Sequence, residues 1–219
     1  MLKKVTMTTL SLLLSLGVSS VTFAQAAKDK ATSNMQFGNA GMTAVEVKNL
    51  HHSGKLLVKK IKVTDSTIIN GTFEAVDSQF NKEAVINGNV DAKTSSFNDL
   101  NVNGNVKFKT VVVNGPANVN GKVDADECDF KNTLNIYGQL SAKKSKFEKK
   151  LTVKSVETDL DECTAQDIIV QKTGNDATQK VILKGTNVNS ITFESGKGVV
   201  EQDDKSTVGK VTGATVEKK

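Results

Sequence analysis

A glycine that recurs at a nearly constant spacing constrains the fold of this 219-residue chain more than any other feature. Each glycine is flanked two residues away on both sides by an apolar residue, and successive glycines are 17, 16, 17 and 17 residues apart. The copies centre on Gly71, Gly88, Gly104, Gly121 and Gly138. A fixed repeat of this length is typical of stacked structural units that each contact only their neighbours.

Four further columns keep the same spacing as the glycine, and apolar and polar residues mostly alternate between them, which is the period of a β-strand. The first column holds mainly small residues and the second mainly phenylalanine: Ser78, Ser95, Val111, Cys128, Ser145 and Cys163, then Phe80, Phe97, Val113, Phe130, Phe147 and Ala165. The other two hold aliphatic residues: Ala84, Leu100, Ala117, Leu134, Leu151 and Ile168, then Ile86, Val102, Val119, Ile136, Val153 and Val170.

Sixteen or seventeen residues are too few for a pair of helices or a propeller blade, but they suffice for one coil of a parallel β-helix. We therefore predict an all-β chain that forms a single parallel β-helix, or solenoid, with coils of about 17 residues. Successive coils would lie about 4.8 Å apart. Parallel crossovers are nearly always right-handed, so we expect a right-handed coil. The phenylalanine column should point inward and stack along the axis.

The N-terminal residues have the pattern of a secretory signal peptide. Lys3 and Lys4 are followed by an apolar run from Leu10 to Val18, and Ala24-Gln25-Ala26 offers the small-x-small pattern that signal peptidase cuts. The apolar run is too short to span a bilayer. We expect residues 1–26 to be removed, the mature chain to be exported to the periplasm or the extracellular space, and no transmembrane segment to remain.

The rest of the chain divides at changes in the repeat. We expect residues 27–42 to form a polar leader and N-terminal cap, residues 43–216 to form the parallel β-helix, and residues 217–219 to form a charged tail. The polar stretch from Gln171 to Lys180 breaks the register and predicts a protruding loop. The β-helix has room for about ten coils, a rod about 50 Å long at 4.8 Å per coil.

The apolar-x-Gly-x-apolar coil and the tail Val208-Gly209-Lys210-Val211-Thr212-Gly213 together resemble the bactofilin, or polymer-forming, β-helix repeat. The resemblance covers roughly Gly54 to Val216 and rests on glycine and valine spacing. Members of that family assemble end to end into filaments, mostly inside the cell. The resemblance thus implies a β-helix that self-associates at its ends, whereas the export signal argues against a cytoskeletal role.

Charges alternate from coil to coil in one region, where Asp126-Glu127, Lys143-Lys144 and Asp161-Glu162 follow one another at the coil spacing. Opposite charges on neighbouring strands stabilise their pairing, so we expect a salt-bridge ladder on the outer surface. The alternative is a cation site that uses Asp124, Asp126, Asp159 and Asp161. The lysines between the two acidic coils and the lack of a calcium-loop spacing favour the ladder.

Two other polar features have structural interpretations. Asparagines precede the glycines as a column, and such side chains can stack as a hydrogen-bonded ladder: Asn70, Asn87, Asn103 and Asn120. His51 and His52 are the only histidines. His52 falls in the inward column of Ile69, so we expect it to fill the lumen near the first coil. A metal site would need further ligands that the local sequence lacks.

The two cysteines allow a definite prediction. An exported chain with two cysteines would ordinarily be assigned a disulfide. Cys128 and Cys163, however, share one column and lie two coils apart, with Ser145 between them. Two coils of rise separate their Cα atoms by about 9.6 Å, and a disulfide needs roughly 4.4–6.8 Å. We therefore predict two free thiols that face the lumen.

No arrangement of residues predicts catalysis, a bound cofactor or a metal centre, and we expect no enzyme. Export, the absence of arginine among the 29 basic residues, and a formal charge that falls from +5 to +3 when Lys3 and Lys4 are removed (5 − 2 = 3) argue against nucleic-acid binding. The chain is expected to be a structural or interaction protein of the cell envelope or exterior, with itself or envelope components as partners. A carbohydrate- or surface-binding module that uses the loop Gln171–Lys180 and one outer face is the alternative, followed by a polysaccharide lyase-type enzyme.

Overall fold

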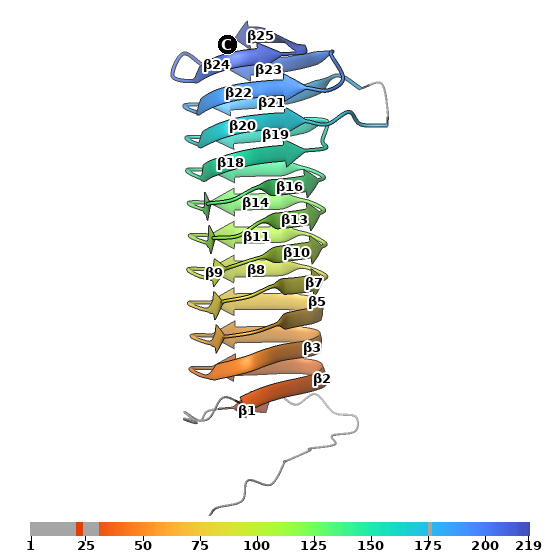
Figure 1. Cartoon of the computed structure of the whole chain (residues 1–219), viewed down its shortest axis with the longest axis vertical. Coiled ribbons are helices and arrows are strands. Elements are labelled where there is room, and N and C mark those ends of the chain that lie inside the picture. The colour runs from red at the N-terminus through yellow and green to blue at the C-terminus, as the bar shows by residue number, and fades with distance from the viewer. Residues whose placement is uncertain (1–20, 24–30, 175–176) are drawn as a thin grey trace, which may run out of the picture.

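The computed structural model describes residues 21–23, 31–174 and 177–219, and in these ranges the chain forms strands and turns without a helix. All 25 strands belong to one parallel sheet that winds into a stack of about 11 turns with a spacing of about 17 residues (Figure 1). The predicted parallel β-solenoid is confirmed, while its hand stays a prediction. The stack is a rod, and each of its two ends is formed by one terminal turn.

Each turn has three flat sides, which we call A, B and C in the order in which the chain forms them. On side A, the short strands are β7 (Ala84–Asn87), β10 (Leu100–Asn103), β13 (Ala117–Asn120) and β16 (Leu134–Tyr137). On side B they are β8 (Val90–Lys93), β11 (Val106–Lys109), β14 (Val123–Asp126), β17 (Leu140–Lys143), β19 (Glu157–Asp161), β21 (Gln179–Lys184), β23 (Gly198–Gln202) and β25 (Ala214–Lys218). On side C they are β4 (Lys62–Val63), β6 (Gln79–Phe80), β9 (Ser96–Phe97), β12 (Val112–Val113) and β15 (Asp129–Phe130).

Longer strands run across a corner and belong to two sides. Sides A and B share β3 (Glu46–Lys59) and β5 (Thr67–Val76), and β3 also reaches side C. Sides C and A share β18 (Lys146–Val153), β20 (Thr164–Val170), β22 (Asn187–Phe193) and β24 (Thr207–Thr212). The first two strands are β1 (Val21–Phe23) and β2 (Ala31–Thr43). Every pairing joins equivalent residues of successive turns, so each sequence column becomes a column in space.

The core is the lumen of the solenoid, and the phenylalanine column fills it as predicted. The rings of Phe80 and Phe97 stack with centroids 4.7 Å apart, and those of Phe130 and Phe147 stack at 5.3 Å. Val113 interrupts this column, and there Phe108 from side B packs on Phe97 at 5.7 Å. Stacked aromatic pairs contribute beyond their buried area, so these rings hold successive turns together.

The corner between sides A and B requires glycine because the backbones of successive turns approach closely there. Gly88 has a φ of 147°, and a Cβ on it would lie 1.8 Å from the carbonyl oxygen of Gly71. The same overlap recurs at the other repeat glycines up to Gly138. The column ends with Ser155 one turn later, and the corner changes shape at that point.

Both predicted boundaries of the solenoid need correction. The expected leader, residues 27–42, is described from Ala31 onwards, and there it is β2, paired with β3. Gly38, at a φ of 104°, forms the same corner as Gly54, and Ala40 and Met42 pack against the core. The expected tail, residues 217–219, also differs, because β25 continues to Lys218 and the Lys219 N–H donates to Gln202 O at 3.0 Å.

The predicted loop leaves the stack between β20 and β21, as Figure 1 shows. It ends earlier than Lys180 because β21 begins at Gln179. The Gln179 side chain is buried, and its Nε2 donates to Ser155 O at 2.9 Å and to Gln171 O at 2.7 Å. The Gln179 amide thus links the two ends of the loop to the turn beneath it. The sequence predicted only an exposed polar loop here and did not predict a buried glutamine.

Candidate interaction surfaces

Each of the four aspartates of the possible cation site forms an ion pair with a lysine. The carboxylates pair with Lys122, Lys109, Lys184 and Lys143 at 3.0, 3.4, 3.2 and 3.2 Å for Asp124, Asp126, Asp159 and Asp161 respectively. Among the described residues, no group of three or more histidine, cysteine, aspartate or glutamate side chains could hold a metal ion. Each carboxylate of the possible cation site therefore takes part in an ion pair on the outer surface.

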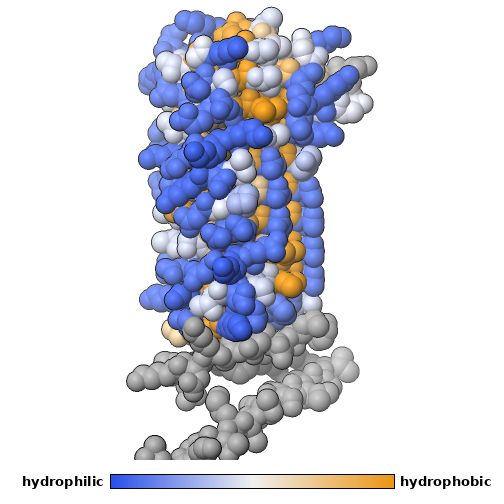
Figure 2. All heavy atoms as spheres, in the orientation of Figure 1, coloured by the Kyte–Doolittle hydropathy of each residue, from blue (hydrophilic) through white to orange (hydrophobic). Residues whose placement is uncertain are grey.

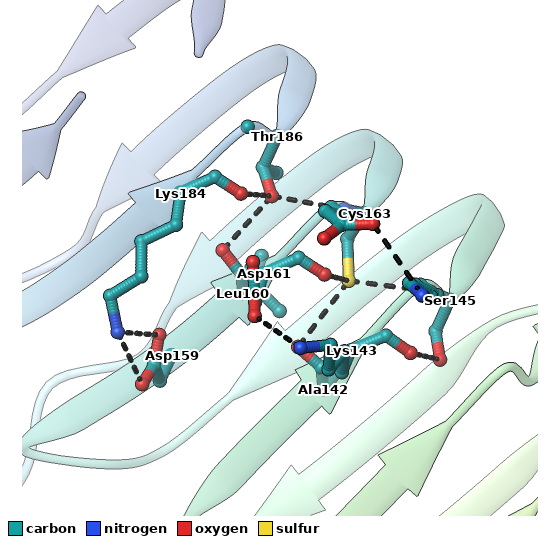
Figure 3. A network of polar contacts seen from close by, with 12 residues as sticks. Ala142, Lys143, Ser145, Asp159, Leu160, Asp161, Cys163, Lys184 and Thr186 are labelled. Carbon is teal, nitrogen blue, oxygen red and sulfur yellow. Dashed lines mark hydrogen bonds and ion pairs between the residues drawn. The ribbon is translucent and has the colours of Figure 1, made fainter. Parts of the chain in front are cut away.

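The alternating charges form a salt-bridge ladder on side B, as expected, with one change of partner. Lys143 pairs with Asp161 and Lys144 pairs with Glu162, the latter at 3.9 Å. Asp126 forms its ion pair with Lys109 of the preceding turn rather than with Lys143. The hydrogen bond and the charge of Asp161 raise the pKa of Lys143. Figure 3 shows the Lys143–Asp161 and Lys184–Asp159 pairs beside each other on neighbouring turns.

The cysteines are buried and free, as predicted from their column. Desolvation raises the pKa of both thiols from 9.0 to about 11. Cys163 Sγ lies 3.2 Å from Asp161 O and receives the Ser145 N–H at 3.4 Å (Figure 3). A thiol that keeps its proton and faces a packed lumen is a poor nucleophile. Both cysteine side chains therefore act as packing residues of the core.

His52 fills the lumen near the N-terminal turns, as predicted, and is 3 % exposed. Its Nε2 lies 3.0 Å from Gly38 O in the neighbouring turn. His51 faces outward, and its Nε2 lies 3.3 Å from Ser66 Oγ. The two histidines point to opposite sides of the sheet, so the structure does not bring them together as a pair.

The predicted asparagine ladder runs along side A next to the glycine corner. Asn87 Nδ2 donates to Asn70 Oδ1 at 3.0 Å, Asn103 to Asn87 at 2.9 Å, and Asn120 to Asn103 at 2.7 Å. Every amide donates in the same direction along the axis. An asparagine has two N–H donors and two acceptor sites, so each internal residue keeps one of each after the ladder bonds.

A second asparagine ladder lies beside the first one and was not predicted. Asn118 Nδ2 donates to Asn101 Oδ1, and Asn135 Nδ2 donates to Asn118 Oδ1, both at 2.9 Å. Asn101 in turn donates to Glu83 Oε1 at 2.8 Å. The sequence does contain this pattern, because Asn101 and Asn118 each stand two residues before an asparagine of the first ladder. The pattern is short, since Val85 holds this position in the turn before and Thr152 in the turn after the three asparagines.

Together the two ladders form an outer surface on side A that we call the amide face. Its members are the outward residues of the side A portions of β3 and β5 and of β7, β10, β13 and β16, none of them a lysine, aspartate or glutamate: His51, Ser53, Ile68, Asn70, Val85, Asn87, Asn101, Asn103, Asn118, Asn120, Asn135 and Tyr137. In Figure 2, hydrophilic columns run along the right of the view with a hydrophobic stripe between them. Side B, by contrast, carries charges on most turns.

The amide face ends at Tyr137, the only tyrosine, whose side chain is 52 % exposed. The next residue, Gly138, lines a hollow of about 510 Å³ together with Gln139, Lys154 and Val156. This hollow lies where Ser155 replaces the corner glycine of the following turn. An exposed aromatic ring therefore marks the point where the flat rows meet a concave surface.

The C-terminal end of the rod leaves strand edges open. Among the described residues, β24 pairs only with β22, and β25 pairs only with β23. Glu201 holds the last strand in place, because its carboxylate contacts Lys180 at 2.5 Å and Lys219 at 2.7 Å. These two lysines lower the pKa of Glu201. Val216, in the middle of β25, is 47 % exposed.

The N-terminal end is covered on one side only within the described ranges. β1 pairs with Ala40, Gly41 and Met42 of β2 on side B. The predicted signal peptide, residues 1–26, otherwise lies outside the described residues, and β1 falls within it. Cleavage after Ala24 or Ala26 would remove β1 and leave the whole outer edge of β2 without this partner.

No protein-family model matches the chain, and searches of curated proteins and of solved structures find no match either. The fold therefore defines the class, a parallel β-solenoid, and the resemblance to the bactofilin repeat stays a prediction. The described residues include no helix that is long and apolar enough to cross a membrane.

Proposed function

We propose that this chain is an exported, non-enzymatic β-solenoid that serves as a structural or interaction element of the cell envelope or exterior by stacking end to end. The observation that carries the proposal is the unpaired edge of the last turn. Open edges of parallel strands are templates for further pairing. A second copy can continue the sheet because its first turn has the same three-sided outline and the same strand direction.

The charges at the two ends support head-to-tail stacking. Within β2, from Ala31 to Thr43, no residue is charged, whereas the last turn carries Lys210 in β24 and Glu217 and Lys218 in β25. The joint between them would therefore bring no like charges together. A head-to-tail joint uses two different surfaces and does not close on itself, so it produces a filament rather than a dimer. Removal of β1 with the signal peptide would restrict assembly to the exported form.

The backbone identifies a substitution that blocks only the joint. Gly213 O and the Lys219 N–H both bond to β23, and alternate residues of a strand point in opposite directions. The N–H of Val216 therefore faces the open edge. Val216→Pro removes this donor and keeps the bonds to β23, because proline is tolerated on an edge strand. Thr215→Pro, whose N–H faces β23, is the matched control that weakens the last turn itself.

The test uses the exported form, with its N-terminus read by sequencing, in sedimentation and negative-stain electron microscopy over a range of concentrations. We expect rods that lengthen with concentration at constant width, and Val216→Pro should stop their growth without lowering the melting temperature. End-to-end stacking is contradicted if the chain stays monomeric at every concentration, or if the Val216→Pro variant forms rods of the same length as the wild type. A chain that is recovered uncleaved from the cytoplasm contradicts export.

A further inference from the structure

We propose that the amide face binds an uncharged, hydroxyl-rich polymer, a neutral polysaccharide strand, that lies along the axis of the solenoid. This surface is separate from the two ends, so the proposal does not depend on filament formation. It rests on the chemistry, the dimensions and the boundary of the face.

The chemistry of the face fits hydroxyl groups. Each internal asparagine of the two ladders has one free N–H and one free acceptor, and a sugar hydroxyl both donates and accepts. The ladder bonds, at 2.7 to 3.0 Å, fix the amides in one orientation before a ligand arrives. Binding therefore does not have to freeze these side chains, which lowers its entropic cost.

The absence of charge selects the kind of polymer. The outward residues from His51 to Tyr137 on side A include no lysine, aspartate or glutamate, although 24 % of the chain is charged. Glu83, just outside the rows, accepts a hydrogen bond from Asn101 at 2.8 Å. An anionic polymer would find no cation on this face, whereas a neutral polymer does not need one.

The dimensions favour a strand over a second copy of the protein. Six strands at 4.8 Å and four residues of each strand give a face of about 29 Å by about 13 Å, roughly 400 Å². A stable protein interface buries about 800 Å² on each partner. The amide face is about half that size and polar, but it is long and narrow, which suits a chain laid along the rows.

Tyr137 provides the apolar contact that such a ligand needs. Its ring is half exposed at the end of the first ladder, in the register position of Asn120. The flat faces of sugar rings carry C–H groups that pack on aromatic rings, and tyrosine adds a polar tip. The hollow beside Gly138 begins one residue further on and gives the end of the strand room to turn away from the flat rows.

The experiment measures retention of the full chain on immobilised cellohexaose and chitohexaose, with polygalacturonate as the charged probe. The test variant is Asn101→Ala/Asn118→Ala/Asn135→Ala. The matched control is Lys107→Ala/Asp124→Ala/Ser141→Ala, which changes the outward column of side B on successive turns. Tyr137→Ala is the second variant, because an exposed side chain can be removed without loss of the fold. Circular dichroism and thermal melting report the fold of each protein.

We expect the asparagine variant and Tyr137→Ala each to weaken retention on at least one neutral oligosaccharide by tenfold or more, and the side B control to change it by less than twofold. Equal retention by all four proteins overturns the proposal, as does retention on polygalacturonate alone or on none of the probes. Concentration-dependent dimers that disappear in the asparagine variant would assign the face to a second copy and also overturn it.

Discussion

Cys128 donates its backbone N–H to Ser145 Oγ, 3.0 Å away in the next turn, and so continues a chain of hydrogen bonds along the corner between sides B and C. Ser78 donates to Ser95 Oγ in the same way at 3.1 Å. Cys163 donates to Thr186 Oγ1 at 3.0 Å. The column of small residues therefore does more than fit a crowded corner: its side chains satisfy backbone groups that face the lumen.

Val111 interrupts this column, and its replacement by threonine should stabilise the protein. In the register of the column the Ser95 N–H faces Val111, which offers no acceptor. Threonine has nearly the shape of valine, and its hydroxyl can accept this N–H and donate to Lys109 O, as Ser145 Oγ donates to Lys143 O at 2.8 Å. We expect a gain of about 0.5–1.5 kcal/mol in the free energy of unfolding, measured by denaturant titration.

The matched control is Val113→Thr, two residues further along the same turn. Val113 is 1 % exposed and lies in the phenylalanine column, where no backbone N–H awaits an acceptor. The added hydroxyl should cost about 1–3 kcal/mol there. If both threonines destabilise the protein equally, the hydrogen-bonded column has no energetic role.

Phe130→Ala should destabilise the protein by roughly 3–5 kcal/mol, because it removes a stacked ring and leaves a cavity in the lumen. Phe130 is 2 % exposed, and its ring is nearly parallel to that of Phe147. Leu57→Ala is the control, since this large apolar side chain is 44 % exposed. A loss below about 1 kcal/mol for Phe130→Ala in denaturant titration would show that the ring does not hold the turns together.

The inward columns could be predicted because a solenoid repeats the same environment in every turn. Phe80, Ser95 and Gly104 each occupy a position that only a few residue types fit, so their spacing reveals the register. The outer surface has no such constraint. Asn101, Asn118 and Asn135 form a ladder that exists only because three successive turns share a residue type, and Val85 ends the pattern without cost to the fold.

The ends were predicted less well for a related reason. A terminal turn has a neighbour on one side only, so its residues are less constrained to follow the repeat pattern than those of the middle turns. Gly38 lies 16 residues before Gly54 and continues the repeat, but the polar residues around it obscure the pattern. The solenoid therefore begins earlier than the composition of residues 27–42 suggested.

Reversing two charges on side B tests the salt-bridge ladder. In Lys143→Glu/Lys144→Glu the new carboxylates face Asp161 and Glu162, and like charges on neighbouring strands oppose pairing. We expect a lower melting temperature than that of the wild type, with a difference that shrinks between low salt and 1 M salt because the charges are screened. The neutral variant Lys143→Gln/Lys144→Gln should fall between them. A difference that is independent of salt would mean that packing rather than charge is responsible.

The buried thiols predict how both alkylation and stability depend on pH. Burial raises the pKa of Cys128 and Cys163 from 9.0 to about 11. Iodoacetamide reacts with the thiolate, so at pH 8 the folded protein should react at least about 100-fold more slowly than the unfolded, unreduced protein, from the two-unit pKa difference alone. Mass spectrometry of the unfolded protein should then show two alkylated cysteines.

The same shift makes stability fall at high pH. Between pH 9 and 11 the unfolded chain loses the thiol protons that the folded chain retains, so the folded state binds more protons and the free energy of unfolding decreases as the pH rises. Below pH 9 both states are protonated, and the thiols add no pH dependence. Cys128→Ser/Cys163→Ser is the control, because serine already occupies this column at Ser145 and keeps the hydrogen bonds to the backbone. Lysines titrate alike in both proteins, so the difference between their denaturant titrations isolates the thiols. The wild type should lose more stability than the variant from pH 9 to 11, and parallel curves would show that the thiols ionise as freely in the folded chain as in the unfolded one.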